Sequence, residues 1–364
     1  MKVKLKKHLK IEVLILIKRI YNMSELLGQG GYGCVYWPEI MCSGKIGSNK
    51  FVSKIQKNNF ASNNEYNIGK IVKNIKNYRS KFVPAISSCH VKLSTINKNV
   101  VKDCNVLKPN NEYISMKFPY VKHSNFDKFF NRTDKKVFYL IEMYKKLVYS
   151  LELLADKNIV HHDLKEDNLI IDYKHNPLII DFGISININD LTIDNYDAYF
   201  YVFATNYYPW SIELHIISYI VQERDNDDIF GKVSIDEINT IIDSYISSTI
   251  FFNLFTTEFV ANYKEALKNN FKYLANKDNQ SIINILLKTY RTWDMVSLSI
   301  LFLKRLTDIY NNKIPNTKFI KELLEILLEN ISPYSDKRLS HKKTIERINK
   351  LKNNTANDFY NSIN

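Results

Sequence analysis

Blocks of apolar and polar residues alternate along this chain at spacings that predict both strands and helices. Two short apolar runs, LIID ending at Asp172 and PLII ending at Ile180, have the length of buried strands, and polar residues gather at their ends. The stretch from Leu140 to Val160 has helical periodicity, with leucines at the spacing of one helix face. Polar side chains at the ends of buried strands are where a rigid scaffold presents chemistry.

A glycine-rich segment, LLGQGGYGCVYW, runs from Leu26 to Trp37. Glycines at Gly28, Gly30 and Gly33 let the backbone bend and bring its N–H donors close to phosphate oxygens. A run rich in aromatic and β-branched residues continues from Val35, so the loop is predicted to join two strands of a hairpin, not a strand to a helix. A plain glycine-rich hairpin without a ligand is the alternative.

Downstream of this loop, Lys54 lies in an alternating strand pattern, KFVSKIQK. A lysine there is often only an exposed side chain, but after a phosphate loop it is placed to reach the phosphates of a nucleotide. It would need an acidic partner, and Glu65 lies near the start of a stretch with helical periodicity, residues 61–75. The alternative is that Glu65 is simply solvated, because the spacing from Lys54 is short.

Residues 161–168 read HHDLKEDN, and residues 181–183 read DFG. With these motifs the chain resembles the eukaryotic-type serine/threonine protein kinase family, whose pattern is H-R-D-L-K-x-x-N followed by D-F-G. The resemblance implies that Asp163 accepts or orients the substrate hydroxyl proton and that Lys165 contacts the γ-phosphate of ATP. It also implies that Asn168 and Asp181 hold Mg²⁺ through oxygen ligands. A small-molecule phosphotransferase of related fold is an alternative, although such enzymes usually lack this lysine.

The same resemblance extends to NEYISMKFPYV, residues 111–121, as the strand that passes the adenine base. Met116 would line the back of the nucleotide pocket, and Lys117 to Pro119 would run past the base. Val35, after the glycine-rich loop, is a further expected nucleotide-binding residue. In this register Pro119 lacks an N–H donor, so one hydrogen bond to adenine would be lost.

Two histidines precede Asp163. His161 is expected to pack and hydrogen-bond within the loop, not to act as a base. His162 replaces the arginine that receives an activation-loop phosphate in phosphorylation-dependent members of the family. We therefore predict an activity that does not depend on such a phosphate.

Family resemblance returns near the C-terminal end, where TWDMVSLSILFL resembles the central helix of the large lobe. Its Asp294 would brace the backbone of the loop around Asp163, and Arg338 is predicted to pair with Glu213. Between Glu213 and Asp294 the chain carries a long insertion, residues 214–290, without Gly/Pro-rich linker texture. We expect ordered helices there that pack on the large lobe.

The chain has 364 residues and a formal net charge of +13. A basic surface favours acidic partners, but the abundance of Asn, Ile and Lys also fits an AT-rich genome, so nucleic acid is not the expected primary ligand.

Four cysteines form no C-x-x-C pair, so neither zinc nor a disulfide framework is expected, and a reducing compartment is the default. No apolar run is long enough to span a bilayer.

The first residues, MKVKLKKHLK followed by the apolar stretch 11–17, resemble the first two regions of a signal peptide. Glu12 interrupts the apolar stretch and no small-residue cleavage site follows, so a strand or a basic membrane-touching extension is the alternative. Met23 is a further candidate for the working start.

Together these patterns predict an α+β, bilobal protein kinase-like fold. Its expected parts are a basic N-terminal extension (residues 1–23), a small, mostly-β N-lobe (24–119) and a larger, mostly-α C-lobe (120–364).

The expected activity is transfer of the γ-phosphoryl group of ATP, with Mg²⁺, to a protein Ser or Thr hydroxyl. Its expected location is cytoplasmic, in host cytoplasm or a virion if the composition and insertion reflect a large DNA virus. Two alternatives stay open: a pseudokinase scaffold, and a basic module that binds nucleic acid or a membrane surface. Oligomeric state and protein substrate are not predicted.

Overall fold

The computed structural model describes residues 24–109, 111–207, 209–223 and 231–354, which divide into two compact units. Unit 1 contains the described residues up to Lys76 together with Val83–Lys122. Unit 2 contains Asn77–Phe82 and the described residues from His123 onward. The predicted extension 1–23 lies outside the described residues. The sequence pattern did not indicate that the short segment 77–82 would group with unit 2.

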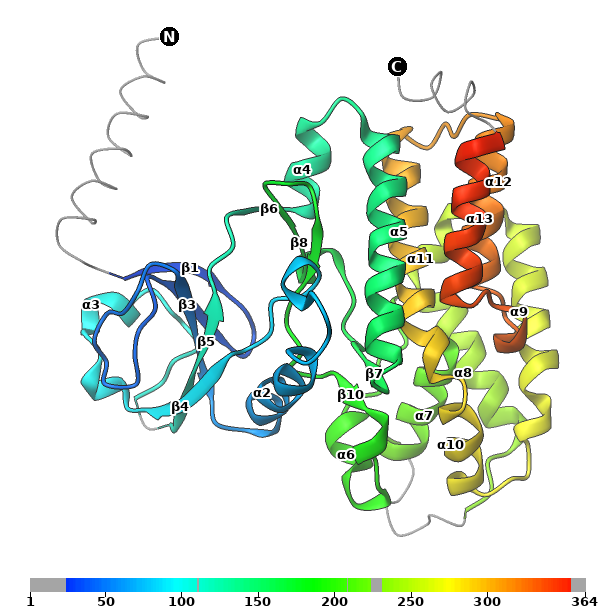
Figure 1. Ribbon diagram of the computed structural model, residues 1–364. Coiled ribbons are helices and arrows are strands. Elements are labelled where there is room, and N and C mark those ends of the chain that lie inside the picture. Colours follow the sequence, from blue (N-terminus) through cyan, green and yellow to red (C-terminus); the bar gives the residue numbers. More distant parts are fainter. Residues whose placement is uncertain (1–23, 110, 208, 224–230, 355–364) are drawn as a thin grey trace. The chain divides into compact units, whose positions relative to one another are not determined.

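Unit 1 is built on a five-stranded antiparallel sheet with strand order β1-β2-β3-β5-β4 (Figure 1). The strands are β1 Glu25–Gln29, β2 Gly33–Trp37, β3 Phe51–Lys57, β4 Ser87–Val91 and β5 Tyr113–Pro119. Among the described residues of this unit, helices α2 Phe60–Val72 and α3 Lys98–Val101 accompany the sheet. The first two strands form the hairpin that the glycine-rich segment predicted.

The register of this sheet brings predicted site residues into one row. Gly28 of β1 lies opposite Val35 of β2, Val35 lies opposite Lys54 of β3, and Lys54 lies opposite Met116 of β5. Side chains of directly opposed residues project from the same face of a sheet. The sheet therefore presents Val35, Lys54 and Met116 together on one face.

Two disulfides, Cys34–Cys104 and Cys42–Cys89, connect distant parts of unit 1. They show that the expectation of no disulfide framework was wrong, and the cysteines give no support to a reducing compartment. The partners are 70 and 47 residues apart in the sequence, and the folding of unit 1 brings Cys34 of β2 to Cys104, which follows α3, and Cys42 to Cys89 of β4. Cys34 and Cys104 both lie inside the hydrophobic core that contains Tyr36 and Tyr113.

Unit 2 is mostly helical. Its helices are α4 Phe126–Arg132, α5 Lys136–Ala155, α6 Tyr196–Tyr199, α7 Ile212–Gln222, α8 Ile235–Ser248, α9 Thr257–Phe271, α10 Asn279–Leu287, α11 Trp293–Ile309, α12 Lys318–Asn330 and α13 His341–Asn354. Helix α5 packs against α11 and α13, and the predicted leucine face of α5 is buried (Figure 1).

Five short strands of unit 2 form two small sheets. They are β6 His123–Asn125, β7 Ile159–Val160, β8 Leu169–Asp172, β9 Pro177–Ile179 and β10 Ile186–Asn187. One sheet has the order β6-β8-β9, and the other pairs β7 with β10. Both apolar runs that lie between the two polar motifs thus form strands, β8 and β9.

In its described part, the insertion 214–290 is helical, as expected. Helix α8 packs against α7 and α9, and α10 packs against α7. Ser234 and Glu237 form a capping box at the start of α8, which satisfies the first backbone donors of that helix. Within the described ranges, none of the helices combines the length and apolar character that a bilayer crossing requires.

Candidate active site

The backbone of the loop before Asp163 is held by Asp294 at the start of α11. The carboxylate of Asp294 accepts hydrogen bonds from the backbone N–H of His161 at 2.6 Å and of His162 at 3.1 Å. His162 has a positive φ of 69°, a left-handed conformation that is uncommon for residues other than glycine. The predicted bracing role of Asp294 is confirmed.

Both histidines of this loop are buried packing residues. His161 donates its Nε2–H to the carbonyl of Ile180 at 3.0 Å, and its ring lies 5.2 Å from that of Phe182. His162 stacks on Trp210 with ring centroids 4.6 Å apart and donates Nδ1–H to the carbonyl of Ile184 at 3.1 Å. Burial lowers the pKa of His162 to about 4, so this ring is neutral near pH 7.

The Asp163 carboxylate receives several donors. Lys165 Nζ donates to its two oxygens at 3.0 and 2.9 Å. The amide nitrogen of Asn168 donates to Oδ2 at 2.9 Å and to the backbone carbonyl of Asp163 at 2.8 Å. The hydroxyl of Tyr207 donates to Oδ1. Three of the four residues that the motifs singled out in unit 2 therefore form one network.

A backbone hydrogen bond places Asp181 next to this network. The N–H of Ile180 donates to the carbonyl of Asn168 at 3.0 Å, so the residue after Ile180 adjoins the end of the Asp163 loop. Asp181 has a positive φ of 64°, and the next residue, Phe182, is fully buried against Phe82. The buried phenylalanine thus fixes the turn that carries the Asp181 carboxylate.

Three residues of this site were not found by sequence reasoning. Arg305 of α11 pairs with Glu166 of the Asp163 loop at 2.8 Å and also with Asp127. Tyr207 contacts Asp163, and Trp210 donates its indole N–H to the carbonyl of His162 at 2.6 Å. The aromatic cluster YYPW at 207–210 was the available signal, but nothing in its spacing indicated the contact with Asp163.

In unit 1, Lys54 Nζ pairs with Glu65 Oε2 of α2 at 2.8 Å. Glu65 is almost fully buried and also accepts from the side chain of Gln56 at 3.4 Å. The short spacing in the sequence thus permits the pair, because β3 leads directly into α2.

The glycines of the phosphate loop differ in their surroundings. A Cβ added at Gly33 would lie 2.4 Å from the carbonyl oxygen of Ile55, so the close approach of β3 requires glycine there. A Cβ at Gly28 or Gly30 would meet no atom of the described residues within 4 Å. These two glycines therefore leave open space above the loop.

The predicted adenine-contacting residues lie within strand β5. Lys117 to Pro119 pair with Phe51 to Ser53 of β3, so their backbone takes part in the sheet. The side chain of Lys117 pairs with Glu39 at 2.9 Å and lies over the ring of Phe51. That side chain is therefore engaged within unit 1.

The predicted ion pair between Glu213 and Arg338 is confirmed. Arg338 Nη2 lies 2.9 Å from Glu213 Oε1, and both side chains are almost completely buried. The pair joins the start of α7 to the segment before α13.

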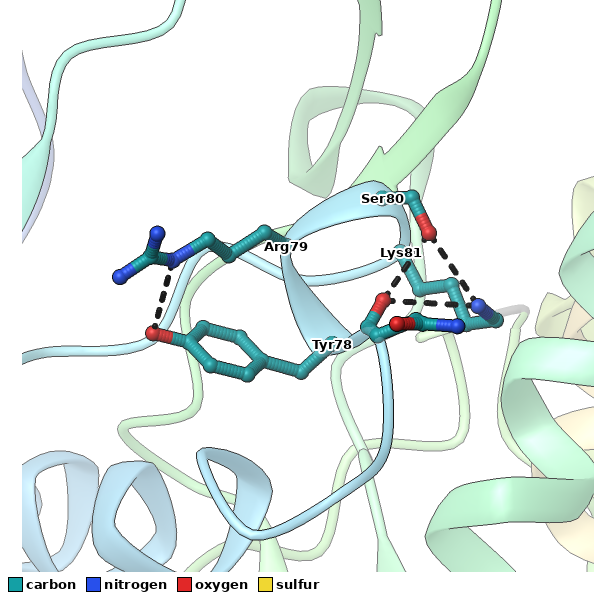
Figure 2. A pocket seen from close by; sticks show the side chains of 5 residues that line it. Tyr78, Arg79, Ser80 and Lys81 are labelled. Atoms are coloured by element: carbon teal, nitrogen blue, oxygen red, sulfur yellow. Dashed lines mark hydrogen bonds between the residues drawn. The ribbon is translucent and has the colours of Figure 1, made fainter.

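A surface depression of about 430 Å³ lies at the turn formed by residues 77–81. Figure 2 shows Arg79 directed to the hydroxyl of Tyr78 and Lys81 near the Asn77 carbonyl and the Ser80 hydroxyl. No predicted site residue lines it.

Residues 21–208, a little over half of the chain, match the protein kinase domain family. The chain is 36% identical over 99 residues to "Probable serine/threonine-protein kinase mkcE" of Dictyostelium discoideum, covering 26% of this chain and 13% of that protein. It is 24% identical over 174 residues to "Probable serine/threonine-protein kinase FPV226" of fowlpox virus (strain NVSL), covering 45% of this chain and 53% of that protein. The chain thus spans about half, or much less, of the length of these relatives. With its N-terminal five-stranded sheet followed by many helices, the chain has the predicted α+β kinase-like fold and belongs to the protein kinase domain family.

Proposed function

We propose that the chain is an ATP-dependent protein kinase that transfers the γ-phosphoryl group to Ser or Thr of a protein substrate. The observation that carries this proposal is the network in which Lys165 and Asn168 donate to Asp163. Phosphoryl transfer depends mainly on positioning and on neutralising charge, and this network places a carboxylate beside a fixed ammonium group. The names of the two relatives and the presence of Lys165 support Ser/Thr as the acceptor.

The residues of unit 1 fit a nucleotide. Gly28 and Gly30 leave space over the loop for phosphate oxygens, and the Glu65 pair would orient Lys54 toward the α- and β-phosphates. Val35 and Met116 flank Lys54 on the same face and supply apolar surface for the base. Lys117 and Pro119 stay the proposed backbone neighbours of adenine.

The donor set also fits a hard cation. The amide nitrogen of Asn168 is committed to Asp163, so its oxygen is the atom that would hold Mg²⁺ together with the Asp181 carboxylate. Within the described ranges no group of three or more His, Cys, Asp or Glu side chains is arranged to hold a metal. Two protein ligands are usual for Mg²⁺ in nucleotide enzymes, since phosphates and water complete its coordination and the ion neutralises phosphate charge.

A transfer assay tests this function. The purified chain is incubated with labelled ATP, Mg²⁺ and a generic basic or acidic protein, beside Lys54→Met and Asp181→Ala. Both substitutions should reduce transfer by at least about 100-fold, because each removes charge stabilisation from the reacting phosphates. Lys57→Met is the matched control, since Lys57 is an exposed lysine on the same strand, β3, and should retain activity.

Absence of transfer by the unsubstituted chain, with intact folding by circular dichroism, would contradict the proposal and favour a pseudokinase scaffold. Binding to DNA or lipid that does not depend on ATP, without transfer, would favour the basic binding module.

A further inference from the structure

The turn of the phosphate loop is closed by its last pair of strand residues, Gln29 of β1 and Cys34 of β2, which lie directly opposite each other. Between them the N–H of Gly30 donates to the carbonyl of Gly33 at 2.9 Å, and the side chain of Tyr32 is exposed. Glycine loses more conformational freedom on ordering than any other residue. A turn of this composition is therefore costly to hold in one shape for a ligand.

Both residues of this closing pair are attached to consecutive residues of one segment. Cys34 forms its disulfide with Cys104, and the backbone N–H of Asn105 donates to Gln29 Oε1 at 2.9 Å. Gln29 Oε1 also lies 3.8 Å from Cys34 Sγ, so the two attachments are adjacent. Together the Cys34–Cys104 bond and the Gln29–Asn105 hydrogen bond form a clasp at the base of the turn.

The segment that provides the outer half of this clasp is itself fixed in unit 1. It belongs to the connection from β4 to β5, which contains α3. Ile96 and Val100 of this connection are buried in the same hydrophobic core as Cys34. Near its end, the hydroxyl of Tyr113 in β5 donates to the carbonyl of Lys108 at 2.9 Å. The clasp thus joins the turn to a packed part of unit 1.

The clasp lies on the face of the hairpin that points away from the proposed nucleotide. Neighbouring residues of a strand project from opposite faces of the sheet. Val35 shares its face with Lys54 and Met116, so Cys34 projects from the other face. Gln29, as the direct partner of Cys34, lies on the Cys34 side. The clasp can therefore act on a bound nucleotide only through the position of the turn.

We propose that this clasp holds the glycine turn in place for the phosphates of ATP, and that Cys34, Cys104 and Gln29 are positioning residues of the reaction. The inference rests on the proposed function for the identity of its ligand, ATP. A turn that is already held in its bound shape loses less conformational entropy when the ligand binds, which raises affinity. Loss of the clasp should weaken ATP binding in the ground state and the transition state alike, and so raise KM without lowering kcat.

The test compares the full chain with its paired substitution Cys34→Ala and Cys104→Ala. Calorimetry measures binding of a non-hydrolysable ATP analogue with Mg²⁺, and steady-state kinetics measures transfer to a protein, both well below the melting temperature of each variant. We expect Kd for the analogue and KM for ATP to rise about 10-fold, the size expected when roughly one backbone residue must be ordered on binding. The value of kcat should stay within about two-fold.

The matched control is the paired substitution Cys42→Ala and Cys89→Ala, which removes the other bridge of unit 1 and leaves the turn attached. It should keep KM for ATP within about two-fold of the unsubstituted value. Gln29→Leu retains the Cys34–Cys104 bridge and removes only the acceptor of an exposed hydrogen bond, so it should raise KM for ATP by about two- to three-fold.

Three results overturn the inference while the proposed function stands: an unchanged KM for ATP without the Cys34–Cys104 bridge, an equal rise in both paired variants, and a fall in kcat alone. Binding of the analogue that weakens without the clasp, with no transfer to any protein, overturns the proposed function alone. Absence of nucleotide binding by the unsubstituted chain overturns both.

Discussion

At the scale of single residues, the substitution of histidine for arginine before Asp163 changes what the loop can recognise. His162 is buried, neutral and stacked on Trp210, and it offers no fork of N–H donors to a phosphate. The ring of His162 packs against Trp210, at the position where the family motif has a charged arginine.

This predicts that Thr192→Ala and Thr205→Ala leave turnover nearly unchanged, because no receptor for a phosphothreonine is present at His162. Steady-state kinetics on a protein substrate measures the effect, with thermal melting as the control for Thr192, which caps a short helical turn. A loss of about 100-fold in either variant, with folding intact, would refute the prediction.

A second residue-scale prediction concerns acid sensitivity. Burial lowers the pKa of His215 to about 3, with His162 beside it adding to the effect, and the ring lies near Trp210 and Tyr245. The unfolded chain binds a proton at this residue below about pH 6.5, whereas the folded chain does not. The contribution of neutral, buried His215 to the free energy of unfolding is therefore fully present above about pH 6.5. It is lost progressively as the pH decreases toward 3.

His215→Phe should flatten the decline in the free energy of unfolding between pH 6 and 4 by up to about 1.4 kcal/mol per pH unit. Denaturant unfolding at several pH values measures this slope. The matched control is His90→Phe at an exposed position of β4. An unchanged slope in His215→Phe would show that this ring is protonated or solvated in the folded protein.

At the scale of elements, disulfides and one buried ion pair connect segments that the chain separates widely. Cys34 lies in β2 directly after the phosphate loop, and its bridge to Cys104 closes a long loop through the core of unit 1. Closing a long loop restricts the unfolded chain, which stabilises the folded state.

Reduction of the protein, or the paired substitution Cys34→Ala with Cys104→Ala, should lower the free energy of unfolding by about 2–4 kcal/mol. Denaturant unfolding with and without a reducing agent measures the loss. The second bridge, in which Cys42 is exposed, offers a comparison through the paired substitution Cys42→Ala with Cys89→Ala. A stability that reduction leaves unaltered would mean that these thiols are not bridged in solution.

Loss of the Glu213–Arg338 pair should lower the free energy of unfolding more than loss of a surface pair does, because both groups are buried. Arg338→Met leaves a buried carboxylate without its cation, and we expect a loss of about 3–5 kcal/mol in the free energy of unfolding. Lys318→Met removes one partner of the exposed Lys318–Glu322 pair and should cost less than about 1 kcal/mol. Equal losses in the two variants would contradict the importance of burial.

At the scale of the whole molecule, the net charge of +13 favours contact with polyanions of any sequence. Such binding releases counterions and weakens steeply as salt increases. Fluorescence anisotropy with two unrelated DNA duplexes should therefore show binding at low salt that disappears near physiological salt, equally for both and without any effect of ATP. Tight binding to one duplex at physiological salt would instead support a nucleic-acid module.

The sequence alone determined the local parts of this protein. Helical periodicity predicted α5 and its buried leucine face, alternation predicted the strand of Lys54, and the spacing around Asp163 and Asp181 indicated the loops that follow short strands. These features depend on neighbours within one element, so spacing along the chain contains the necessary information.

Only the tertiary structure decided the contacts between distant elements. The bridge from Cys34 to Cys104 spans 70 positions, and the ion pair from Glu166 to Arg305 spans 139. The same is true of the Tyr207 hydroxyl on Asp163. Such contacts form because buried faces of strands and helices pack together, and the energy of that packing depends on which side chains meet in space, which a pattern along the chain does not record.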